Sequence, residues 1–60
     1  MNDYIIDITN EAGVVVMEST DKALLDQDEI TVGRTQWIVS SVEEEFDDYY
    51  NITRYTIYVY

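Results

Sequence analysis

The 60-residue sequence contains no cysteine, no histidine and no proline. Without cysteine, neither a disulfide bond nor a thiolate metal site can form. Without histidine, the chain lacks the commonest general base of enzymes and the commonest zinc ligand. A chain of this length buries only about 60% of the surface that its unfolded form exposes. Packing alone, or packing combined with self-association, must therefore hold the fold together.

Positive charge is also scarce. Only Lys22, Arg34 and Arg54 face thirteen acidic residues, which leaves a formal net charge of −10. Such a chain repels the phosphates of nucleic acids and the headgroups of anionic membranes. The charge is therefore expected to attract a basic protein surface or a cation, or to serve solubility alone.

Long apolar runs are missing as well. No run approaches the roughly 18 residues that a membrane span needs. Met1–Asp3 carry no positive charge, and no apolar core of signal-peptide length follows them. We therefore expect a cytoplasmic protein with no membrane partner. Apolar residues still make up 47% of the chain, which is too many for a disordered acidic tail.

The hydrophobic pattern alternates with a period close to two, which is typical of β-strands. The predicted elements are five strands and one or two helical turns, over Tyr4–Thr9, Val14–Glu18, Lys22–Gln27 (helical), Glu29–Val32, Thr35–Val39 and Ile52–Tyr60. Residues 1–60 are thus predicted to form a single small acidic domain that is mostly β. It would be either a five-stranded antiparallel sheet or an SH3-like, partly open barrel.

The first hairpin has a clear turn but an ambiguous register. Asn10 suits the first position of a type I turn, and Gly13 suits the left-handed position that closes it. A slip of one residue would exchange the two faces of the returning strand. The sequence leaves open which alternate pair faces the core, Val15 and Met17 or Val14 and Val16.

The later strands have clearer faces. Gly33 followed by Arg34 fits a type II′ turn, whose twist matches that of its flanking strands. Counting outward from this turn places four apolar residues on one face: Ile30, Val32, Trp37 and Val39. In the last strand, one face is predicted to hold Thr53, Tyr55, Ile57 and Val59.

Residues 43–50 hold five of the thirteen acidic residues and three aromatic ones. We interpret this segment as a long loop, with at most one helical turn, because it is too charged to pair as a flat strand. Its carboxylates would steer a basic groove toward the chain, and Phe46, Tyr49 or Tyr50 would anchor the contact. The plainer alternative is a solvated loop with Phe46 packed into the core.

A second acidic group precedes the second hairpin and could share the same surface. The predicted partner-binding residues are therefore Glu43, Glu44, Glu45, Phe46, Asp47, Asp48, Tyr49, Asp26, Asp28 and Glu29. A compact domain of about 25 Å would lie along about fifteen phosphates of duplex DNA. In size and charge, the chain resembles the DNA-mimic proteins.

The leading hypothesis is therefore a non-catalytic acidic protein, such as a phage-type inhibitor, that inhibits another protein by occupying its basic, nucleic-acid-binding surface. The competing hypothesis is a structural or assembly subunit. In that case Tyr58 and Tyr60, on the face opposite Ile57, would form a homodimer contact.

Catalysis and dedicated metal binding are not expected. Neither Asp26–Glu29 nor Asp47-Asp48 has the ligand pattern of an EF-hand calcium loop. Paired carboxylates such as Glu43 and Glu45 would need a cleft that separates their pKa values, and so small a domain has little room for one. We predict no catalytic residue, no metal site and no cofactor.

Overall fold

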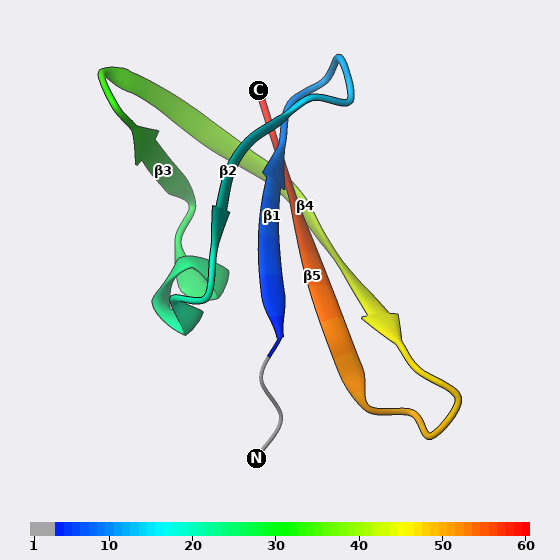
Figure 1. The fold of residues 1–60 in the computed structure, drawn as a ribbon. Coiled ribbons are helices and arrows are strands. Elements are labelled where there is room, and N and C mark those ends of the chain that lie inside the picture. Colours follow the sequence, from blue (N-terminus) through cyan, green and yellow to red (C-terminus); the bar gives the residue numbers. More distant parts are fainter. Residues whose placement is uncertain (1–3) are drawn as a thin grey trace.

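The computed structural model describes residues 4–60, so Met1–Asp3, which entered the prediction of a cytoplasmic location, lie outside the described residues. The elements are β1 (Ile5–Thr9), β2 (Val15–Ser19), the 3-10 helix η1 (Lys22–Asp26), β3 (Glu29–Val32), β4 (Thr35–Phe46) and β5 (Ile52–Val59). The strands form one sheet in the order β2-β1-β5-β4-β3, which curls into a half-barrel (Figure 1). The predicted mostly β, partly open barrel is confirmed.

One strand pair runs in a direction that was not predicted. β1 and β5 are parallel, whereas the other three neighbouring pairs are antiparallel. The sheet is thus mixed rather than antiparallel throughout. Alternation of apolar residues predicts which face of a strand is buried but carries no information about the direction of its neighbour. A parallel pair needs a long crossover, and here the chain from β2 to β4 provides it.

The core lies on the concave side of the half-barrel. Its fully buried members are Ile6, Ile8, Ile30, Ile57 and Val59. Partly buried side chains packed against them include Val32, Trp37, Val39 and Tyr55. The predicted faces of the second hairpin and of the last strand are therefore confirmed in their apolar residues.

The first hairpin resolves its ambiguous register with a bulge. Ile8 pairs with Met17 and Thr9 pairs with Val15, which leaves Val16 as the extra residue. As a result, Val16 and Met17 both pack against the core. Neither predicted pair, Val15 with Met17 or Val14 with Val16, faces the core as a pair. The bulge instead places two successive side chains on the packed side.

The connections in the middle of the chain are a capped helical turn and a tight hairpin turn. Asp21 caps the helix by accepting a hydrogen bond from the backbone N–H of Ala23 at 3.0 Å. The helix is a short 3-10 turn rather than an α-helix, and its residues Leu24 and Leu25 pack against the core. Gly33 has a φ of 61°, as the first central position of a type II′ turn requires.

β4 is the main departure from the prediction. It was expected to end at Val39, with a long loop over residues 43–50, but it continues to Phe46, and Glu43–Phe46 pair with β5. The prediction was wrong because charge disfavours burial rather than backbone pairing. A strand exposed at the sheet edge keeps its carboxylates in water while its backbone bonds to one neighbour. We call residues 43–56, which comprise this end of β4, the turn and the start of β5, the acidic arm.

Candidate partner-binding surface

The alternation of β4 divides the acids of the arm between two faces. Residues that pair across neighbouring strands share a face. Glu45 pairs with Arg54, and Glu43, two residues away, lies on the same face. Glu44 pairs with Tyr55 and therefore lies on the opposite face, which continues into the core. The arm thus presents carboxylates on both of its sides rather than on one.

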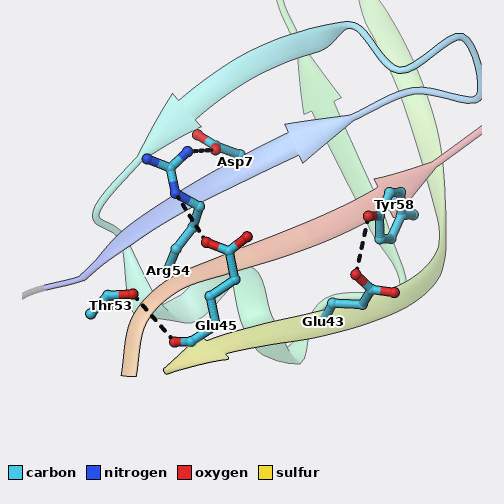
Figure 2. A network of polar contacts seen from close by, with 6 residues as sticks. All are labelled: Asp7, Glu43, Glu45, Thr53, Arg54 and Tyr58. Atoms are coloured by element: carbon cyan, nitrogen blue, oxygen red, sulfur yellow. Dashed lines mark hydrogen bonds and ion pairs between the residues drawn. The ribbon is translucent and has the colours of Figure 1, made fainter. Parts of the chain in front are cut away.

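Glu43 is held by a neighbouring tyrosine. The Tyr58 hydroxyl donates a hydrogen bond to Glu43 Oε2 at 3.2 Å (Figure 2). This bond, together with the negative charge of Glu43, raises the pKa of Tyr58 above its usual value, because both favour the neutral phenol. Tyr58 and Tyr60 were the two residues predicted for a homodimer contact. The hydroxyl of Tyr58 is thus bonded within its own chain, whereas Tyr60 is 55% exposed.

Arg54 ties the arm to the body of the sheet. Its guanidinium forms an ion pair with the buried carboxylate of Asp7 on β1, and its Nε lies 3.7 Å from Glu45 Oε2 on β4 (Figure 2). On the same part of the arm, the Thr53 hydroxyl donates to the backbone carbonyl of Glu45 at 3.4 Å. The Arg54 side chain thus joins three neighbouring strands, β1, β5 and β4. This linkage restricts movement of the arm relative to the core.

Asp7 was missed by the sequence reasoning. Its side chain is 7% exposed, and its Oδ1 atom has no hydrogen-bond partner among the described residues. The available signal was a lone acid within the apolar run Ile5-Ile6-Asp7-Ile8. Such an acid is rarely buried unless it is paired, so it indicates a cation on a neighbouring strand. Arg54 is that cation.

The tip of the arm is a tight turn that Asp47 organises. Its Oδ1 accepts hydrogen bonds from the backbone N–H groups of Tyr49 at 2.8 Å and Asn51 at 3.0 Å. The Asn51 bond is the larger cause of a pKa for Asp47 below its usual value, because N–H donors stabilise the carboxylate. The N–H of Tyr50 donates to the Asp47 carbonyl at 3.1 Å, and Tyr50 itself has a left-handed φ of 62°.

The aromatic residues of the arm are exposed. Tyr49 is 84% exposed, Tyr50 is 87% exposed and Phe46 is 52% exposed. The alternative in which Phe46 packs into the core is therefore wrong, because β4 carries it to the distal end of the arm. Tyr50 was a candidate anchor but was not among the predicted partner-binding residues. The backbone places it beside Tyr49 at the tip.

The second acidic group lies elsewhere. Asp26 ends η1, and Glu29 begins β3, where its carboxylate accepts a hydrogen bond from the Gln36 amide at 2.6 Å. The carbonyl of Asp28 accepts a hydrogen bond from the backbone N–H of Val39 at 2.8 Å. Figure 1 shows η1 and the β4–β5 turn on opposite sides of β1. The structure thus divides the ten predicted residues into two groups and brings together only the seven between Glu43 and Tyr49.

Residues 4–60 contain no pocket and no grouping of three or more side chains arranged to hold a metal ion. None of the helices within this range has the length and apolar character needed to cross a membrane. Comparison with protein-family models, curated proteins and solved structures finds no match to this chain.

Proposed function

We propose that the chain is a non-catalytic acidic binding protein whose arm occupies a basic, nucleic-acid-binding surface of another protein and thereby inhibits it. The observation that supports this proposal is the arm itself. It carries the exposed acids Glu43–Glu45 on both faces and two exposed tyrosines at its tip. The molecule is elongated, with principal extents of 37 × 21 × 16 Å. An elongated acidic element can enter a groove that a globular face could not.

The charge of the arm favours a basic partner. Residues 43–56 contain five acids and a single cation, Arg54, which is engaged by Asp7 and Glu45. This local excess of negative charge attracts a positively charged surface over about a Debye length, which is about 8 Å at physiological ionic strength. The association rate should therefore fall steeply with added salt.

The tip supplies candidate anchors. Tyrosine is enriched among the residues that dominate binding energy at interfaces, and it loses little side-chain entropy on contact. Tyr50 occupies a left-handed conformation that costs a residue with a side chain roughly 1–2 kcal/mol. Backbone strain of this kind is concentrated at functional sites. A tyrosine in this position is therefore consistent with a requirement for its side chain in contact with a partner.

The first test is capture from a bacterial lysate at low salt followed by elution at high salt. The arm variant replaces Glu43, Glu44 and Glu45 with Lys. The matched control replaces Asp26, Asp28 and Glu29 with Lys, and so changes the net charge equally. We expect the wild type and the control variant to retain the same basic protein, whereas the arm variant does not. Equal retention by all three forms, or equal loss from both variants, would contradict a binding surface on the arm.

The second test addresses inhibition. The recovered protein is mixed with labelled duplex DNA, and the acidic chain is titrated in. Release of the duplex in proportion to binding is the expected result, since both ligands would use one basic surface. Simultaneous binding of the duplex and the chain would refute the inhibitor mechanism. A cytoplasmic location also belongs to this proposal, and cell fractionation tests it.

A second candidate function is self-assembly, which the exposed pair Ile38 and Tyr60 favours. These residues exchange both backbone hydrogen bonds and are 43% and 55% exposed. Sedimentation separates the two functions. A dimer that resists salt and dissociates in Tyr60→Ala would support assembly, whereas a monomer at all salt concentrations would support the acidic binding protein.

A further inference from the structure

The outer edge of β4 is open along the acidic arm. β3 pairs with β4 only from Thr35 to Ile38, and the last backbone bond on that side runs from Val39 N–H to the Asp28 carbonyl at 2.8 Å. From Ser41 to Phe46, β4 pairs with β5 on one side. Within residues 4–60, no strand pairs with its other side (Figure 1). Half of the longest strand therefore has a free edge.

This free edge is a template for another strand. In an antiparallel ladder, alternate residues direct their N–H and C=O groups away from the paired neighbour. An extended segment can satisfy those groups by adding to the sheet. The edge is also held in place, because Arg54 links the arm to β1 and Asp47 fixes the turn beyond Phe46. A fixed template loses little conformational entropy when a strand binds.

Charge selects the kind of strand that can bind. A second copy of the chain would place its own Glu43, Glu44 and Glu45 against the same residues, and opposed like charges destabilise a strand pair. Each whole chain carries a net charge of −10, which adds long-range repulsion. An added strand would meet Glu43 and Glu45 on one face and Glu44 on the other. The complementary strand therefore has lysine or arginine on both faces.

We propose that the edge of β4 from Ser41 to Phe46 binds an extended, lysine- or arginine-rich segment of the partner as an additional strand of the sheet. The inference rests on the proposed function and specifies how the arm recognises its partner. Val42, which is 41% exposed and pairs with Ile57, adds a preference for an apolar residue opposite it. Backbone bonds would contribute affinity, and the acids would restrict binding to basic segments.

Two synthetic peptides test this mode of binding. One repeats the triplet Lys-Lys-Val, which places lysine on both faces of an extended strand. The other repeats Lys-Lys-Pro, so it has the same length and charge but cannot pair as a strand, because proline lacks an N–H group. Affinity is measured at equal salt, and amide hydrogen exchange reports which backbone groups become protected. We expect the lysine–valine peptide to bind about tenfold more tightly, which corresponds to about 1.4 kcal/mol. It should slow exchange within residues 41–46 and leave the β2 edge, Val15–Ser19, unchanged.

The outcomes separate the strand mode from the proposed function. Equal affinity for the two peptides, with both lost in the Glu43, Glu44 and Glu45 to Lys variant, would overturn strand addition and leave an acidic binding arm. Protection along β2 instead of β4 would also overturn it. If the lysine–valine peptide protected β4 equally in that variant, the strand mode would stand, but the charge-based function would fail.

Discussion

The molecule contains two turns with the same hydrogen bonds and different residues. In the first, Asn10 Oδ1 accepts from the N–H groups of Ala12 and Val14, and the Asn10 carbonyl accepts from Gly13. In the second, Asp47 takes the place of Asn10, and its Oδ1 and carbonyl accept the equivalent bonds. The position that closes each turn has a left-handed φ, 79° at Gly13 and 62° at Tyr50.

The difference between the turns lies at the closing position. Glycine adopts a left-handed φ without a steric penalty, whereas a residue with a Cβ atom does not. The closing residue of the first turn, Gly13, therefore suits its left-handed conformation. The closing residue of the second turn, Tyr50, does not. Because the Tyr50 side chain is 87% exposed, its own packing offsets little of that cost. The first turn thus serves folding, whereas the second carries a backbone cost that its own packing does not offset, and this difference supports the proposed contact with a partner.

The largest predicted loss of stability comes from placing tyrosine, the closing residue of the second turn, at the closing position of the first. Gly13→Tyr is expected to lower the free energy of unfolding by about 1–2 kcal/mol. No atom lies within 4 Å of a Cβ built at Gly13, so the loss would come from the backbone rather than from a clash. Denaturant titration measures it. A neutral result would show that the left-handed position carries no cost in this fold.

The next largest loss of stability is expected from removing the side-chain hydrogen-bond acceptor, Asn10 or Asp47, of either turn. Asn10→Ala frees two N–H groups to bind water and is expected to cost about 1 kcal/mol. Asp47→Ala should destabilise its turn more than Asn10→Ala does, because hydrogen bonds to a charged acceptor are stronger. Amide exchange at Tyr49 and Asn51, compared with exchange at Ala12 and Val14, measures the two losses. The reverse order would contradict the stronger role of Asp47.

Tyr50→Gly is expected to raise stability. Removing the strain should add somewhat less than about 1 kcal/mol, because glycine also gives the unfolded chain more freedom. Thermal unfolding measures the gain, and Tyr49→Gly is the matched control. Tyr49 has a negative φ, so the control should lower stability. A loss of stability in both variants would mean that Tyr50 contributes to the fold.

The smallest predicted effect is a difference between the two turns at low pH. The pKa of Asp47 is lower in the folded state, so the contribution of Asp47 to stability is fully present above its unfolded value of about 3.8. It is lost as the pH falls through the lower, folded pKa. Asn10 does not titrate. Amide chemical shifts of Tyr49 and Asn51 should therefore change in that acid range before those of Ala12 and Val14 do. A simultaneous change would indicate global unfolding.

The sequence predicts the parts of the fold that depend on alternation and turn chemistry. The buried face of β5 at Ile57 and Val59 and the turns at Gly13 and Gly33 follow from local rules. The parallel pairing of β1 with β5 does not, because it depends on how distant segments meet.

The candidate site was less predictable. The sequence indicates an acidic, aromatic segment but not that Glu43–Phe46 form a strand, since pairing there depends on β5. The bridge from Asp7 to Arg54 joins residues far apart in the chain, and only the sheet order brings them together. The left-handed conformation of Tyr50 could have been foreseen by comparing residues 47–51 with residues 10–14, because both begin with an Asp or Asn that favours such turns.

The central claim is that the tip of the acidic arm is shaped for a partner rather than for stability. Its most direct test is to measure, for Tyr50→Gly, both the free energy of unfolding and the affinity for the basic protein recovered through the arm. We predict that stability rises while affinity falls about tenfold, as expected when an interface anchor is lost. A variant that is more stable and binds as tightly as the wild type would contradict the claim.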